Sequence, residues 1–184
     1  MLTSIIRMHN AAFSALETTI GNWLPSLFAR FAFASVLGLY YWTSFQTKIG
    51  SGLFGFLNIA DGAYYQILPS VIDAAGNDVA NVSFFPWTII VYLGTYAEFL
   101  LPVLIMLGLF TRLASLGMIG FIIVQSFVDV VFHDIGAEAT GAMFDRFPDA
   151  AIFDQRLLWV VPLVFLVIKG AGAASLDALL SKRY

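Results

Sequence analysis

The residues best placed to do chemistry in this chain are Glu98 and Pro102, which lie four positions apart in a long apolar stretch. The stretch, Trp87 to Leu109, has about the 20 residues that cross a hydrocarbon core of about 30 Å. A carboxylate at its centre costs at least about 2.5–3.5 kcal/mol unless another group stabilises it. Proline donates no hydrogen bond to the carbonyl four residues earlier, so Pro102 leaves the Glu98 carbonyl free. The pattern predicts a buried polar site that neighbouring helices, water or a ligand must satisfy.

Arg30 and Tyr96 are candidates to join this site. Arg30 lies about 9 Å inside the first apolar span and Glu98 about 16 Å from the same end, at 1.5 Å per residue. A snorkelling arginine could close that gap and form a buried Arg30–Glu98 pair. We interpret such a pair as part of a pocket for a quinone or another small polar headgroup, which Tyr96 could also bind. The alternatives are a pair that only fixes helix register and a tyrosine that only packs between helices.

A second polar group lies on the third apolar span. Gln125, Asp129 and His133 recur every four residues and therefore share one helix face near its outer end. They indicate a proton relay, or contact with a metal or substrate at the outer mouth; the alternative is interfacial polar residues that face the loops. Asp129 and His133 alone offer too few ligands to predict a metal site.

Charged residues at 145–146 and 154–156 flank the start of the fourth apolar span. We expect them to fold over the outer mouth and pair with Asp129, His133 or Lys48. The alternative is a set of solvated loop charges.

The composition excludes several classes of protein. Hydrophobic residues make up 60% of the 184 residues and charged residues only 11%, which indicates lipid as the solvent. A net charge of −3 without a basic tract gives no surface for nucleic acid. The absence of cysteine excludes disulfides, thiolate metal sites and thiol nucleophiles. The two histidines fall in different expected elements, which excludes a bis-histidine haem in the bundle, and no nucleotide-binding motif occurs.

The hydropathy pattern predicts an all-α membrane protein, an antiparallel bundle of four transmembrane helices. The expected spans are about residues 24–45, 87–109, 113–131 and 157–174. The last is long enough only if the helix continues through 170–174.

The remaining segments divide the chain into two regions. Residues 1–23 are expected to form an N-terminal amphipathic segment on the cytoplasmic membrane surface, and 24–184 the four-helix domain. Residues 46–85 are too apolar for free solution, so they should form short helices that cap the bundle. A tight turn with Thr111 as the helix N-cap makes the second and third spans antiparallel neighbours.

The placement of lysine and arginine predicts the orientation. Arg7, Arg30, Arg112, Lys169, Lys182 and Arg183 fall at one end of the four-span arrangement, and Lys48, Arg146 and Arg156 fall at the other. Since the excess marks the cytoplasmic side, both termini are expected in the cytoplasm and both long connections outside.

The chain resembles the DoxX family from about residue 24 onward. The likeness rests on Arg30, Lys48, Glu98, the stretch Gly108-Leu-Phe-Thr-Arg-Leu-Ala114, and the ending Lys169-Gly-Ala-Gly-Ala-Ala-Ser-Leu-Asp-Ala-Leu-Leu180. Residues 118–126 and 154–156 are similar to its proteobacterial branch. The resemblance implies a four-helix protein of the bacterial inner membrane. Members of the family have been linked to thiosulfate:quinone oxidoreductases and to membrane complexes that handle oxidative and sulfur stress.

The leading expectation is a membrane subunit of a quinone-linked redox complex, with partner proteins and no redox centre of its own. Its quinone site would take polarity from Arg30, Glu98 and Arg112, with Tyr96, Asp129 and His133 completing it. One alternative is a membrane scaffold or assembly factor that docks partner proteins. Another is a small-molecule transporter, although four spans without inverted repeats leave little room for alternating access unless the protein forms a homo-oligomer.

Overall fold

The computed structural model describes residues 2–182, and this part of the chain is helical apart from turns and one isolated bridge between Ile49 and Ile59. Arg183, counted above among the basic residues of one end, lies outside the described residues. Four helical stretches are long and apolar enough to cross a membrane: Leu24–Gln46, Phe84–Leu107, Thr111–Val131 and Ala151–Lys169. In each, a third or less of the most apolar window is buried inside the protein, which leaves the rest to face lipid. The predicted membrane bundle of four helices is therefore confirmed.

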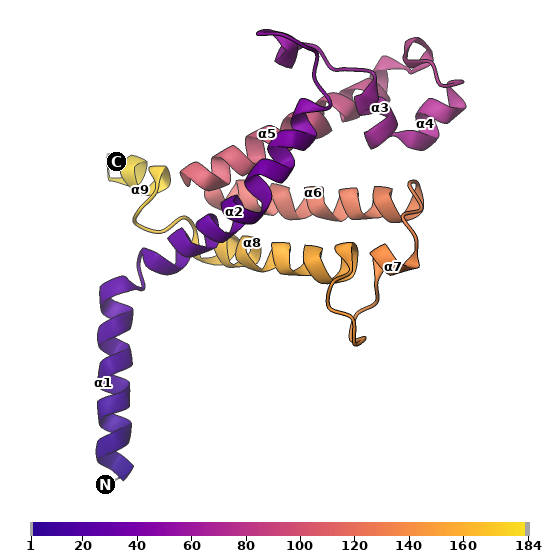
Figure 1. Ribbon diagram of the computed structural model, residues 1–184. Coiled ribbons are helices and arrows are strands. Elements are labelled where there is room, and N and C mark those ends of the chain that lie inside the picture. The colour runs from indigo at the N-terminus through magenta and orange to yellow at the C-terminus, as the bar shows by residue number, and fades with distance from the viewer. Residues whose placement is uncertain (1, 183–184) are drawn as a thin grey trace.

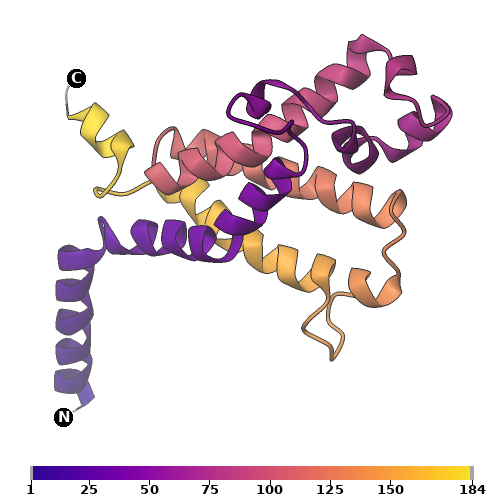
Figure 2. The same cartoon turned by 45° about the horizontal axis from the view of Figure 1, so that its top comes forward.

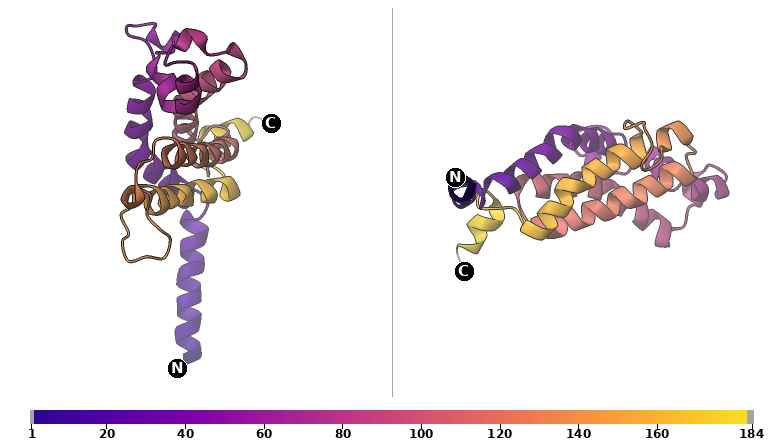
Figure 3. Two further views of the ribbon diagram at one scale, coloured as in Figure 1. Left: turned by 90° about the vertical axis from the view of Figure 1, so that its right-hand side faces the viewer. Right: turned by 90° about the horizontal axis from the view of Figure 1, so that it is seen from below.

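The spans pack in a closed ring in which each has two neighbours. They are α2 (Leu24–Gln46), α5 (Ile89–Leu107), α6 (Thr111–Val131) and α8 (Leu157–Lys169). Helix α2 packs on α5 and α8, and α6 packs on the same two helices (Figures 1 and 3). The core between them contains large side chains such as Phe33, Tyr41 and Met118, all almost fully buried. Adjacent helices in the ring are antiparallel, as the short turn between α5 and α6 predicts.

The bundle has two ends that differ in composition. We call the end that holds the start of α2, the α5–α6 turn and α9 (Leu176–Ser181) the terminal face, because the N-terminal helix and the C-terminal helix both leave the bundle there (Figures 1 and 2). The opposite end, the loop face, holds the two long connections, residues 47–83 and 132–150. The second connection contains the single-turn helix α7 (Ala137–Thr140).

The predicted cap of short helices is present at the loop face. It consists of η1 (Gly55–Leu57), α3 (Gly62–Ile67), α4 (Pro69–Ala74) and η2 (Val79–Asn81). Ala63, Tyr64 and Ile72 from the cap bury themselves against Val91 of α5, which forms a small second core. This packing explains why so apolar a connection is stable at the end of the bundle.

The fourth span gains its length at the end opposite to the one predicted. Helix α8 stops at Lys169 because Gly170 adopts φ 78° and ψ −170°, an extended conformation of positive φ that suits glycine and cannot continue a helix. Residues 170–174 are therefore not helical, and the extra turns come from η4 (Ala151–Arg156), which leads directly into α8. The second span similarly begins three residues early, with η3 (Phe84–Thr88).

Helix α1 (Leu2–Ile20) stands apart from the ring. None of its described side chains is buried, and it runs crosswise to α6 and α8 from the start of α2 (Figures 1 and 3). Ile5, Phe13 and Leu16 lie on one side of it and Arg7 on the other, as expected for an amphipathic helix. Its placement on a membrane surface stays a prediction.

Candidate functional site

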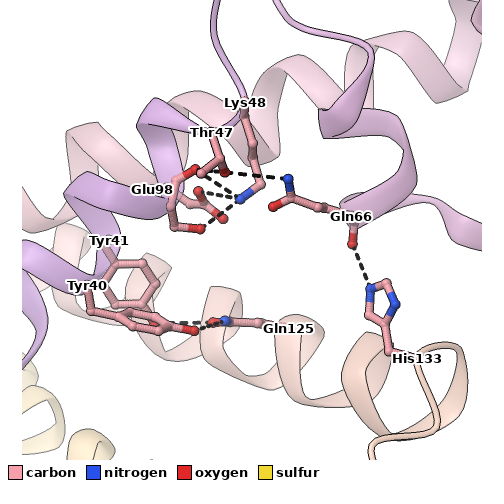
Figure 4. A network of polar contacts seen from close by, with 9 residues as sticks. Tyr40, Tyr41, Thr47, Lys48, Gln66, Glu98, Gln125 and His133 are labelled. Carbon is pink, nitrogen blue, oxygen red and sulfur yellow. Dashed lines mark hydrogen bonds and ion pairs between the residues drawn. The ribbon is translucent and has the colours of Figure 1, made fainter.

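Glu98 is buried in the bundle and forms an ion pair with Lys48. The Lys48 Nζ lies 3.0 Å from Glu98 Oε2, and the two side chains are only 4% and 6% exposed (Figure 4). The same ammonium donates to Ser44 Oγ at 2.7 Å and to the Ser44 carbonyl at 3.3 Å. An ammonium has three hydrogens to donate, so these contacts use all of them.

The predicted Arg30–Glu98 pair does not form, because the two side chains lean in opposite directions. Helical side chains tilt toward the N-terminus of their own helix. Glu98 on α5 therefore leans toward the loop face, while Arg30 on α2 leans toward the terminal face. Lys48 lies two residues beyond the end of α2, and its side chain runs back into the bundle to Ser44, where the carboxylate meets it.

A cleft of about 410 Å³ lies between α2 and α5 beside this pair. Its lining residues are Ala34, Gly38, Leu39, Trp42, Glu98, Phe99, Pro102, Val103 and Met106. Ala34 and Gly38 create the space because they are small, and Trp42 and Phe99 form an aromatic wall with ring centroids 5.7 Å apart. Among these lining residues Glu98 alone is charged. Leu39 is 79% exposed, so the cleft opens sideways toward lipid.

One oxygen of Glu98 is free to accept a hydrogen bond. Lys48 donates to Oε2 and the Ser44 hydroxyl also lies near the carboxylate, but none of the hydrogen bonds found within residues 2–182 ends at Oε1. Pro102, one turn further along α5, also lines the cleft and leaves the Glu98 carbonyl without its helical donor. The cleft therefore offers acceptors to a ligand, while the nearest cation is fully occupied.

The polar residues of α6 bind three different elements near the loop face. The Gln125 amide donates to Tyr40 Oη at 2.8 Å and accepts from Tyr41 Oη at 3.3 Å, both on α2 (Figure 4). A ring nitrogen of His133 lies 3.1 Å from the Gln66 carbonyl in the cap. Gln125 and Asp129 share a face of α6 as predicted, whereas His133 lies two residues beyond the end of the helix at Val131. The Gln125 and His133 side chains hold α2 and the cap against this end of α6.

The third residue of this face, Asp129, pairs with Arg156 at the end of η4. Arg156 is buried, donates to Ser126 Oγ at 3.0 Å and lies over the Trp159 ring at 5.8 Å. The expected pairing with Asp129 is therefore confirmed for Arg156. It is not found for Asp145 and Arg146, whose contacts are with Phe147. A role of this face as a proton relay stays a prediction.

Arg30 belongs to the terminal face, where it ties the C-terminal segment to the α5–α6 turn. Its guanidinium donates to the carbonyls of Met106, at 3.1 Å, and of Ala174. Gly108 lies so close that a Cβ there would be 2.7 Å from Arg30 Nη1, and its φ of 68° also requires glycine. Arg30 thus fixes the chain ends and lies far from the cleft carboxylate.

The start of α6 is capped from a distant segment. Thr111 is the first residue of α6, and the Asp177 carboxylate accepts from the Phe110 and Thr111 amides at 2.7 and 3.0 Å and from the Thr111 hydroxyl at 2.8 Å. The prediction of Thr111 as the N-cap was therefore wrong, because a carboxylate 66 residues later satisfies these free amides.

The remaining predicted site residues lie elsewhere. Arg112 is exposed at the terminal face next to Gly170. The Tyr96 hydroxyl donates to the Phe56 carbonyl at 2.6 Å. Tyr96 lies about one turn of α5 from Phe99, on the side of the loop face. The six predicted residues thus divide among the cleft, the loop face and the terminal face, and only Glu98 lines the cleft. The sequence analysis did not identify Lys48 as the partner of Glu98. The feature that indicates it is a lysine directly after an apolar span.

Four apolar helices around a buried ion pair define a multi-pass membrane protein of the helical-bundle class. A family model described as DoxX matches residues 25–134, which include α2, the cap, α5 and α6. The chain belongs to the DoxX family. Comparisons with curated proteins and with solved structures found no match.

Proposed function

We propose that this protein is a membrane subunit of a quinone-linked redox complex and that the cleft between α2 and α5 binds the quinone headgroup. The observation that supports this most is a lipid-facing cleft with one buried, half-satisfied carboxylate. Its volume of about 410 Å³ suits a small-molecule site. An isoprenoid tail would stay in the lipid beside Leu39, so a headgroup could enter without leaving the membrane.

The free polar atoms favour the reduced form of such a ligand. A quinol carries hydroxyl groups, and one of them can donate to Glu98 Oε1, whereas a quinone carbonyl needs a donor. Lys48 could supply one only by giving up a contact with Ser44 or Glu98. Trp42 and Phe99 would flank the ring, because aromatic faces stack favourably.

Oxidation of a quinol releases two protons and two electrons. Lys48 stabilises Glu98 as a carboxylate before the reaction, and Glu98 Oε1 is positioned to accept one of the protons, which neutralises the acid. The second proton would leave to water or to the partner protein. The electrons would pass to a partner protein that carries the redox centre. We place that centre in a partner because the chain has no cysteine and its two histidines, His9 and His133, lie on elements at opposite faces.

We further propose that both termini lie in the cytoplasm and that the membrane is the bacterial inner membrane. Arg30, Arg112, Lys169 and Lys182 lie at or near the terminal face, and Arg7 lies on α1, which leads into that end of the bundle. The loop face holds Lys48, Arg146 and Arg156. Since the excess of lysine and arginine marks the cytoplasmic side, these positions support the orientation.

Glu98→Gln tests the proposal in the native complex. The amide keeps the shape of the side chain but cannot take up a proton, so quinol-dependent turnover should fall at least about 100-fold. Asp129→Asn is the matched control, since it alters a second carboxylate of the bundle outside the cleft and should leave turnover close to wild type. Wild-type turnover in Glu98→Gln, at normal protein levels, would exclude the cleft as the quinol site.

A further inference from the structure

The segment directly after α2 exposes large apolar side chains. We call residues 51–57 the apolar loop; in it Leu53 is 86% exposed, Phe54 66% and Leu57 59%. No charged residue occurs between Lys48 and Asp61. The loop projects from the end of α2, well apart from α3 and α4 (Figure 1). Exposure of such a cluster to water would be unfavourable, so the question is which apolar surroundings cover these side chains.

Backbone hydrogen bonds hold the base of the apolar loop in a fixed shape. Ile49 and Ile59 form an antiparallel bridge, and the Gly50 amide donates to the carbonyls of Asn58 at 2.8 Å and Gly55 at 3.1 Å. A Cβ on Gly55 would lie 1.9 Å from the Gly50 carbonyl oxygen, so only glycine fits there. The exposed side chains therefore sit on a defined turn.

The apolar loop borders the loop-face edge of the cleft. The Tyr96 hydroxyl binds the Phe56 carbonyl at 2.6 Å, and the Tyr96 ring lies 6.3 Å from that of Phe45. Phe45 in turn stacks on Phe99, a wall of the cleft, at 5.2 Å. This chain of contacts places the loop beside the sideways opening between α2 and α5.

We infer that the apolar loop is inserted in the lipid at the loop face and forms one border of the cleft opening. It follows a membrane-spanning helix within a few residues, carries no charge and presents its large side chains outward, which is what an interfacial lipid contact requires. The inference does not depend on which molecule the cleft binds.

Single-cysteine labelling of the full chain in lipid nanodiscs tests this inference, because the natural sequence contains no cysteine. Phe54→Cys, carrying a bimane dye, should lose most of its fluorescence when the nanodisc lipids have brominated acyl chains. It should resist quenching by aqueous iodide. Phe54 is an exposed side chain, so the substitution should not affect folding.

Phe144→Cys is the matched control. Phe144 is a fully exposed phenylalanine in the other loop-face connection, but Asp145 and Arg146 follow it directly. Its dye should be quenched by iodide and spared by brominated lipid. A Phe54 dye quenched by iodide and spared by lipid would place the loop in water and overturn the inference. Protection from both quenchers would mean that a second copy covers it, and equal lipid quenching of both labels would show no specific insertion; each would also overturn it.

Discussion

Two ion pairs join elements of the described bundle, and they differ in what surrounds the carboxylate. In the Lys48–Glu98 pair both side chains are almost fully buried, at 4% and 6% exposure. In the Arg156–Asp129 pair the arginine is equally buried, at 8%, but the aspartate is 25% exposed. The carboxylate of the first pair lines a cleft, while the second pair holds η4 against α6. Similar groups thus serve a candidate binding site at one position and helix packing at the other.

The two ion pairs also differ in how many hydrogen-bond donors of the cation are in use. Lys48 has all three donors in use, whereas Arg156 keeps a buried Nε without a hydrogen-bond partner among the described residues. In the first pair only the acid keeps an unused hydrogen-bonding atom, Glu98 Oε1. In the second pair the arginine Nε and one oxygen of the partly exposed Asp129 both lack a partner among the described residues. A ligand that donates hydrogen bonds is therefore expected at the first pair.

The largest effect on stability should come from Lys48→Met. This change leaves Glu98 buried without its cation, which should lower the free energy of unfolding by about 3–5 kcal/mol. Denaturation in mixed detergent micelles would measure the loss. The double variant Lys48→Met/Glu98→Leu should recover most of it, because no charge then remains buried. If Lys48→Met alone were as stable as wild type, the carboxylate would not depend on this lysine.

A smaller effect is expected for Asp129→Asn. Its partner Arg156 stays hydrogen-bonded to Ser126, and Asp129 is partly exposed, so the cost should be about 1.5–3 kcal/mol, the range for a hydrogen bond to a charged group. The same denaturation assay applies. A loss as large as that of Lys48→Met would show that the two pairs contribute equally and would remove the contrast between them.

The smallest effect should come from Ser44→Ala. The change removes one acceptor of the Lys48 ammonium and should cost about 1 kcal/mol. Thr43→Ala, one residue earlier on an exposed side of α2, is the control and should be nearly neutral. If the two variants proved equally stable, the Ser44 hydroxyl would contribute nothing to holding Lys48.

The sequence was sufficient for the spans, the cap and the buried position of Glu98, because each depends on local hydropathy and spacing. It was not sufficient for the partner of Glu98. A count of residues along each helix measures the depth of a Cα atom but ignores the direction in which the side chain leans, and that direction selected Lys48 over Arg30.

Other errors came from contacts between distant segments. The amides at the start of α6 are satisfied by Asp177, which no pattern near Thr111 reveals. Helix α8 ends at Lys169 because Gly170 adopts an extended conformation of positive φ, and the span gains length from η4 instead. Hydropathy alone assigns such boundaries poorly, since glycine and alanine at 170–174 are neither strongly apolar nor charged.

Lys48 takes part in two structures through two different parts of the same residue. Its backbone carbonyl accepts from the Ala60 amide and so closes the turn that carries Leu53 and Phe54, while its ammonium holds Glu98. A displacement of that turn within the leaflet would pull on the lysine main chain and shift its head relative to the acid. If the apolar loop lies in lipid as inferred above, membrane thickness and lipid packing at that leaflet would act on the protonatable group through Lys48.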